Sequence, residues 1–128
     1  MKKRFYLIPL FLLLLVSSCN KPLLKYNSNF EGTWYSEAKY NSVMGKFVCD
    51  EFTFSGTSGT YQIDCQDTCA TNLCTCTGKL TGKAEINQQH DKIRLNSQTP
   101  RVFVLNTEPY EQGGSWFMEI DGRTYKKQ

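Results

Sequence analysis

Apolar and polar residues alternate along most of the chain after position 30, which is typical of strands that bury one face. Phe52 and Phe54 fall on one face of such a strand, and Thr53 falls on the other. Tyr61 and Ile63 repeat the pattern in the next apolar stretch. Beyond the first 18 residues, no stretch shows the 3.6-residue apolar stripe of a helix. The pattern therefore predicts an all-β domain.

Clusters of Gly, Pro, Asn, Asp and Ser interrupt this alternation about every eight to twelve residues, as turns do in all-β domains. Eight stretches rich in β-branched and aromatic residues fit between the clusters. The predicted strands are residues 33–40, 46–54, 60–65, 76–87, 92–96, 101–107, 115–120 and 123–127.

Two turns allow the strand register to be tested, because a slip of one residue would turn the apolar set outward. Asp121-Gly122 is a strong two-residue hairpin signal, and residues 87–92 form a longer turn. Both turns place apolar residues opposite one another, in the pairs Met118–Tyr125, Ile86–Ile93 and Ala84–Leu95. Sequential hairpins make a meander, and closing eight strands removes the exposed edges. We therefore predict an antiparallel up-and-down eight-stranded barrel, with a β-sandwich as the alternative.

The beginning of the chain has a different pattern. Residues 2–4 are basic, residues 5–16 are apolar apart from Pro9, and the small residues Ser17 and Ser18 follow. This is the three-part layout of a secretory signal. The apolar run is about a dozen residues, which is short of the ~20 that a stable membrane span needs. The pattern favours a signal peptide at residues 1–18 over a resident transmembrane helix.

The end of this leader, Val16-Ser17-Ser18-Cys19, resembles the bacterial lipobox. The resemblance implies diacylglyceryl transfer to the Cys19 sulfur, cleavage after Ser18 and acylation of the new amino group. Such an anchor holds a protein on a membrane more firmly than one acyl chain does. Asn20 stands where an aspartate would resemble the inner-membrane retention signal, so the resemblance implies a lipid-anchored protein of the outer membrane. The alternative is an ordinary secreted protein with an incidental cysteine.

Cleavage would change the length and the charge of the chain. Removing 18 residues from 128 leaves 110, enough for one domain with a single core. The leader holds three of the 15 basic residues, so the remaining 12 balance the 12 acidic residues. A formal net charge of zero gives no indication of nucleic-acid binding. Residues 19–29 are polar without periodicity and predict a tether, which leaves residues 30–128 as the domain.

The first predicted strand opens with Gly32-Thr33-Trp34. Gly-x-Trp at the start of an eight-stranded meander resembles the lipocalin signature. In that family the tryptophan closes one end of the barrel and an arginine of the last strand packs over it. The resemblance implies these roles for Trp34 and, by position, Arg123, a cation–π contact of about 1–2 kcal/mol. The chain departs from full-size lipocalins in ending with the last strand, where they have a helix.

Six cysteines become five if Cys19 carries lipid, and clustered cysteines in an exported domain indicate disulfides. Pairing Tyr61 with Leu80 places Cys65 opposite Cys76. Cys69 and Cys74 would then pair within the loop, and the pattern predicts that Cys49 remains a thiol. The alternative pairs Cys49 with a cysteine of the loop.

The same loop could instead hold a soft metal at Cys74-Thr75-Cys76, but the spacing matches no strong zinc pattern. His90 is the single histidine and lies in a predicted turn, which leaves little for a catalytic triad. The carboxylates near the cysteines (Asp50, Glu51, Asp64 and Asp67) are interpreted as surface charges. We expect no enzyme activity, no metal and no cofactor.

Two functions remain. The first is a lipid-anchored, lipocalin-like barrel that binds a small apolar molecule or lipid. The second is a structural or interaction module of the cell envelope with a filled barrel and no ligand. An eight-stranded barrel can be filled by its own side chains or hold one small ligand, so the interior of the barrel separates the two hypotheses.

Overall fold

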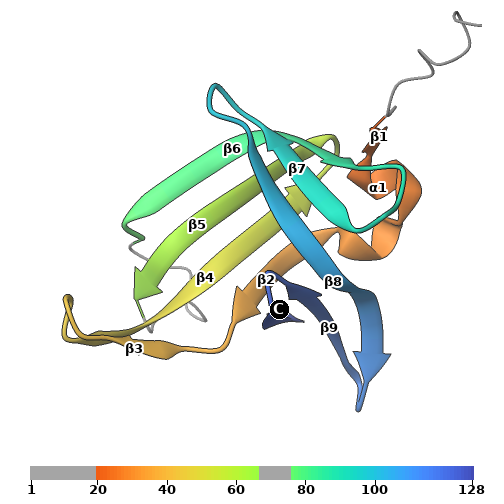
Figure 1. Cartoon of the computed structure of the whole chain (residues 1–128). Helices are drawn as coiled ribbons and strands as arrows, with labels where there is room; N and C mark the ends of the chain where they lie inside the picture. Colours follow the sequence, from red (N-terminus) through yellow and green to blue (C-terminus); the bar gives the residue numbers. More distant parts are fainter. Residues whose placement is uncertain (1–19, 67–75) are drawn as a thin grey trace, which may run out of the picture.

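The computed structural model describes residues 20–66 and 76–128, which form strands and a short helical segment (Figure 1). The helical elements are α1 (Leu23–Tyr26) and the 3₁₀ helix η1 (Ser28–Phe30). The strands are β1 (Lys21–Pro22), β2 (Gly32–Ser36), β3 (Lys39–Asn41), β4 (Lys46–Ser55), β5 (Ser58–Gln66), β6 (Gly78–Ile86), β7 (Lys92–Asn96), β8 (Arg101–Gln112), β9 (Ser115–Ile120) and β10 (Arg123–Lys127).

Eight of these strands form a closed antiparallel barrel. Their order is β6-β5-β4-β2-β10-β9-β8-β7, and pairing of β7 with β6 closes the ring. The two remaining strands attach from outside, β1 to β6 and β3 to β4. The predicted barrel is confirmed, and the chain does not adopt the alternative sandwich. In the described sheet each of the eight barrel strands pairs with a neighbour on both sides, whereas β1 and β3 each pair with a single strand.

The predicted hairpin registers are also confirmed. Tyr125 pairs with Met118 across the Asp121-Gly122 turn, and both turn residues have positive φ, as this tight turn requires. The turn at residues 87–92 gives the expected pairs Ile86–Ile93 and Ala84–Leu95. Tyr61 also lies opposite Leu80 between β5 and β6, as expected. Local turn chemistry therefore sets which side chains enter the barrel.

Two predicted strands differ from the structure by more than two residues at one end. The first predicted strand divides into β2 and β3, because the chain leaves the barrel at residues 37–38 and β3 pairs only with the outer part of β4. The strand predicted at residues 101–107 continues to Gln112 in β8. Pro109 is accommodated there because the pairing with β9 is irregular between Thr107 and Tyr110.

The segment expected as a tether is packed against the barrel from Lys21 onward. Lys21 pairs with Ile86 of β6, and α1 follows directly. Leu23 and Phe30 are buried among the core residues, so α1 and η1 cover one end of the barrel (Figure 1). Burial of these two side chains outweighs the poor intrinsic stability of such short helices.

Aromatic rings fill the interior. The Phe52 ring centroid lies 4.7–5.6 Å from those of four neighbours, and all five residues are at most 6% exposed. The neighbours are Phe54, Tyr61, Phe103 and Tyr125. Contacts of this kind add to the stabilisation from apolar burial.

Two facing glycines of the barrel wall have no room for a side chain. Gly59 of β5 lies opposite Gly82 of β6. A Cβ atom on Gly59 would lie 2.5 Å from the Leu95 side chain, and one on Gly82 would lie 2.4 Å from the Asn96 backbone. A side chain at either position would force its neighbours to move, so the close approach at these two positions depends on glycine.

Candidate functional site

The end of the barrel opposite α1 and η1 is closed by a polar network around Asp50. The side chain of Asp50 is buried, although its neighbours Cys49 and Glu51 continue the pairing with β5. The register shifts between Cys49 and Glu51, so Asp50 lies in a β-bulge that turns its carboxylate into the barrel. The interpretation of Asp50 as a surface charge is therefore wrong.

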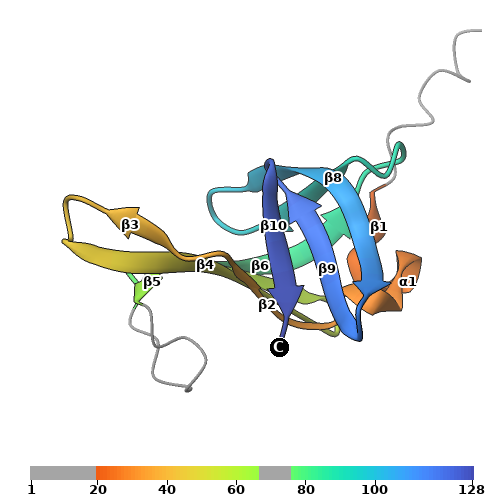
Figure 2. The same cartoon turned by 90° about the horizontal axis from the view of Figure 1, so that it is seen from below.

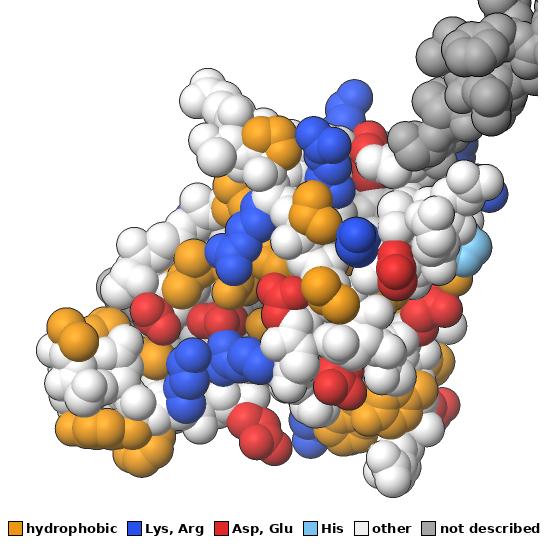
Figure 3. Space-filling model, viewed as in Figure 1, with side chains coloured by type: hydrophobic (Ala, Val, Ile, Leu, Met, Phe, Trp, Pro, Cys, Tyr) orange, Lys and Arg blue, Asp and Glu red, His pale blue; other side chains and the backbone are white. Residues whose placement is uncertain are grey.

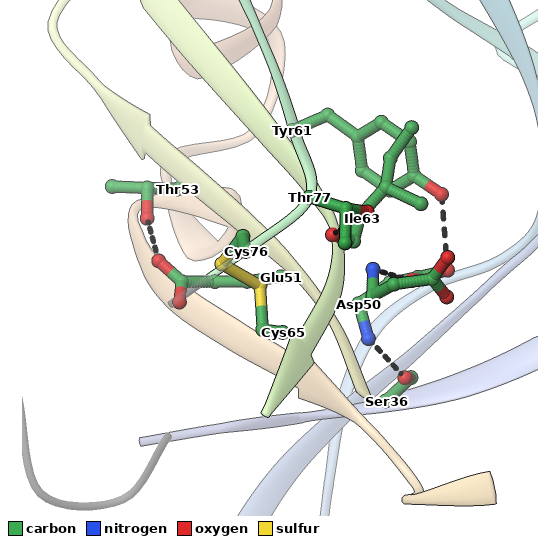
Figure 4. Close-up of a disulfide and its surroundings, with 10 residues drawn as sticks. Ser36, Asp50, Glu51, Thr53, Tyr61, Ile63, Cys65, Cys76 and Thr77 are labelled. Carbon is green, nitrogen blue, oxygen red and sulfur yellow. Dashed lines mark hydrogen bonds between the residues drawn. A yellow bond between two sulfur atoms is a disulfide. The ribbon is translucent and has the colours of Figure 1, made fainter. Parts of the chain in front are cut away.

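The carboxylate of Asp50 accepts several hydrogen bonds (Figure 4). Tyr61 donates its hydroxyl to Oδ2 at 3.0 Å, and the backbone N–H of Asp64 donates to Oδ1 at 3.1 Å. The Asp64 backbone has φ 49°, a conformation that aspartate tolerates better than most residues. The backbone N–H of Asp50 donates to Ser36 Oγ at 2.8 Å, which ties β4 to β2.

Arg123 completes the network from the first position of β10. Its guanidinium forms an ion pair with the Asp50 carboxylate and donates to Ser36 Oγ at 2.9 Å. The Asp50 side chain is 8% exposed and that of Arg123 is 26% exposed, so the pair lies at the edge of the interior. Pairing and hydrogen bonding compensate for the cost of removing these charges from water.

The prediction that Arg123 packs over Trp34 is therefore wrong. Trp34 pairs with Lys127 at the other end of β10, and the Lys127 ammonium lies 5.1 Å from the centroid of the indole ring. The indole Nε1–H donates to the carbonyl of Phe30 at 2.8 Å. Trp34 does close one end of the barrel, but the cation over it comes from Lys127.

Burial changes the chemistry of two tyrosines beside Asp50. Burial, together with the Asp50 carboxylate and its hydrogen bond, raises the pKa of Tyr61 to about 12. Burial also raises the pKa of Tyr125, with smaller contributions from Tyr61 and Asp50. The guanidinium of Arg101 lies 4.8 Å from the centroid of the Tyr61 ring and 4.7 Å from that of Phe103, and so covers the aromatic interior from outside.

The predicted disulfide between Cys65 and Cys76 is confirmed and lies at this same end (Figure 4). It extends the β5–β6 register beyond the last backbone pair, Ile63 with Gly78. Cys49 is buried opposite Cys65 and lies outside this disulfide. The predicted pair of Cys69 and Cys74 lies outside the described residues.

A two-stranded hairpin projects from the polar end. It consists of β3, the turn at residues 42–45 and the first residues of β4, and Figure 2 shows it extending away from the barrel. Tyr40, Val43 and Phe47 are its exposed apolar side chains, and hydrophobic atoms gather on this projection at the lower left of Figure 3.

Two of the hollows in the described surface lie outside the barrel interior. One, of about 370 Å³, lies over β2, β9 and β10 and includes Tyr35, Phe117 and Lys126, which alternate with the core residues of those strands. Another, of about 250 Å³, lies at the exposed edge of Arg123 and includes Glu37.

The other residues that the sequence suggests for metal binding or catalysis do not come together in the described part of the chain. There, no group of three or more His, Cys, Asp or Glu residues is placed to hold a metal. His90 has φ 58° in its turn, and its ring centroid lies 4.1 Å from that of Tyr26. Glu51 accepts a hydrogen bond from the Thr53 hydroxyl on the outer face. Asp67 lies outside the described residues.

Within residues 20–66 and 76–128, no helix has the length and apolar character of a membrane span.

Comparison of the chain with protein-family models, with curated proteins and with solved structures gives no match.

Proposed function

We propose that this chain is a lipid-anchored protein of the bacterial cell envelope whose filled barrel is a rigid structural module and not a carrier of a small ligand. The observation that supports this choice is the aromatic interior. Phe52 alone contacts four other buried rings, and the space that a ligand would need is occupied by side chains. Both ends are closed as well, one by Phe30 and Trp34 and the other by the Asp50–Arg123 pair.

The attachment of residues 20–30 to the barrel supports a structural role at a membrane surface. Lys21 is already paired with β6, so only Asn20 separates the barrel from Cys19. A chain spans at most about 3.6 Å per residue. Lipid on Cys19 would therefore hold the barrel close to the bilayer, whereas a longer flexible linker would let the barrel move farther from it.

The ligand hypothesis is tested with an apolar fluorescent probe and with native mass spectrometry. Wild-type protein is expected to show no saturable binding of the probe. Phe52→Ala opens a cavity lined by aromatic side chains and is expected to bind a benzene-sized molecule. Phe103→Ala provides a second cavity if Phe52→Ala does not fold. A stoichiometric apolar molecule in protein purified from its own envelope would contradict the proposal.

The anchor is tested separately by mass spectrometry of the amino-terminal peptide. We expect a chain that begins at Cys19 and carries a diacylglyceryl group and an acyl group. Cys19→Ser is expected to carry no lipid, because the hydroxyl is a much poorer nucleophile than the thiolate. An unmodified Cys19 in the wild-type protein would contradict the lipid anchor.

A further inference from the structure

The projecting hairpin exposes apolar side chains that the fold does not need. Val43 at the turn is 94% exposed, and Tyr40 and Phe47 behind it are 60% and 52% exposed. The two rings pack edge to face with centroids 5.4 Å apart, so they form one fixed apolar surface behind the turn. Such a concentration of exposed apolar groups on one projection indicates an interaction site.

The backbone at the turn already has internal hydrogen-bond partners. The side-chain oxygen of Asn41 accepts from the N–H groups of Val43 and Met44, at 3.0 and 3.1 Å. The carbonyl of Asn41 accepts from the N–H of Gly45 at 2.8 Å. Because these three donors are satisfied within the turn, moving it out of water costs less than it would for an open loop.

The charge around the turn has a single sign. Lys39 and Lys46 flank the apolar side chains, and there is no acidic residue between Ala38 and Cys49. Both lysines are exposed. In the backbone pairing of β3 with β4, Lys39 lies opposite Val48 and Lys46 lies opposite Asn41. The hairpin therefore presents an apolar tip with a cationic base.

We propose that this hairpin inserts into the surface of a membrane that contains anionic lipids. Val43 and Met44 enter the acyl region first, the rings of Tyr40 and Phe47 lie at the headgroup level, and the lysines contact lipid phosphates. This order matches the preferences of aliphatic, aromatic and basic side chains across a membrane interface. Each lysine near an anionic surface contributes about 1 kcal/mol.

Charge argues against a second copy of the chain as the occupant. A symmetric contact through two hairpin tips would bring the lysines of both copies together, and residues 39–48 of the hairpin hold no carboxylate to compensate them. A lipid surface of negative charge avoids this repulsion.

The proposal does not depend on lipid at Cys19, since insertion uses only the hairpin. The hairpin and β1 lie at opposite ends of the molecule in both views (Figures 1 and 2). If both contacts form, the long axis of the protein lies along the bilayer. Loss of either contact leaves the other intact, so the two proposals fail independently.

The test uses residues 20–128 and synthetic vesicles. The core lies between Leu23 and Tyr125 and the ring of strands closes within that range, so this segment contains the whole described barrel. Cooperative unfolding of the segment is checked first. Flotation is then compared for vesicles of phosphatidylglycerol with phosphatidylethanolamine and for vesicles of phosphatidylcholine. We expect binding to the anionic vesicles, and weaker binding as the salt concentration rises.

Variants of exposed residues identify the contact. Lys39→Gln with Lys46→Gln is expected to weaken binding about 30-fold. Val43→Asp is expected to weaken it by about 10-fold or more, since a carboxylate at the tip opposes both insertion and the negative surface. Val102→Asp is the matched control, because Val102 is an exposed valine of β8 outside the hairpin, and it should bind more tightly than Val43→Asp.

Insertion itself is measured with Val43→Trp, whose emission should shift to the blue on anionic vesicles. Equal effects of Val43→Asp and Val102→Asp would overturn the proposal, as would an unshifted emission spectrum. An absence of binding to either vesicle would also overturn it. A dimer in analytical ultracentrifugation that Val43→Asp makes monomeric, without vesicle binding, would identify a second copy as the occupant instead.

Discussion

At one end of the barrel Leu23, Phe30 and Trp34 close the interior with apolar side chains, whereas at the other end Asp50 and Arg123 close it with an ion pair. At the apolar end, Leu23 and Phe30 come from a segment that precedes the barrel in sequence, and Trp34 comes from the barrel strand β2. The polar end is built from residues of the barrel strands themselves. The projecting hairpin and the Cys65–Cys76 disulfide both belong to the polar end.

The two ends of the barrel are therefore closed by different interactions, apolar burial at one and an ion pair with hydrogen bonds at the other. Apolar burial is not directional, so the apolar end needs volume and shape. The polar end needs particular partners, because a buried carboxylate without them is costly. We therefore expect single substitutions to remove volume at the apolar end and to leave an unpaired group at the polar end.

The largest expected effect is at the apolar end. Phe30→Ala removes a fully buried ring and should lower the free energy of unfolding by about 3–5 kcal/mol. The measurement is urea unfolding followed by circular dichroism. Phe47→Ala is the control, since this ring is half exposed on the hairpin and its loss should cost less than about 1 kcal/mol. Similar small losses for both variants would mean that η1 does not close the barrel.

The next effect is at the polar end. Arg123→Met keeps much of the side-chain volume but leaves the Asp50 carboxylate without its cation, and should cost about 3 kcal/mol. Arg94→Met, on the outer face of β7, should change stability by less than about 0.5 kcal/mol.

A double-mutant cycle sharpens this second prediction. Adding Asp50→Asn to Arg123→Met removes the charge that Arg123→Met leaves unpaired, so the combined loss should be smaller than the sum of the two single losses. A coupling of about 1–3 kcal/mol is expected for residues in one network. Strict additivity would show that Asp50 and Arg123 do not act as a pair.

The smallest expected effect is a change in the dependence of stability on pH. The pKa of Tyr61 is about 12 in the folded protein and 10.0 for an ordinary tyrosine, so the folded state favours the protonated phenol. Its contribution to stability is complete below pH 10 and is lost as the pH rises through 12. Tyr61→Phe should flatten the decline of stability above pH 10 in urea titrations. Tyr61→Phe with Tyr125→Phe should flatten it further, and an unchanged slope would contradict the assignment.

Features set by neighbouring residues in sequence were predictable. The Asp121-Gly122 turn fixes its own hairpin, so the partners of Met118 and Tyr125 follow from local chemistry. The Cys65–Cys76 pair follows in the same way, by extending the register of Tyr61 and Leu80.

Features that depend on distant strands were not predictable in this way. The partner of Trp34 depends on the register of β10 against β2, which no turn connects, and a lysine takes the place expected for Arg123. The burial of Asp50 depends on a bulge, whose only trace in the sequence is an acidic residue within an apolar strand. Leu23 enters the core from a segment too short to show a helical period.

The facing glycines of β5 and β6 also define a way to recognise distant relatives. At Gly82 a methyl group would collide with backbone, which cannot rotate away as a side chain can. A homologue with the same close approaches is therefore expected to keep a glycine aligned with Gly82 and, opposite it, one aligned with Gly59. Two glycines 23 positions apart are a signature that can survive when overall sequence identity has been lost.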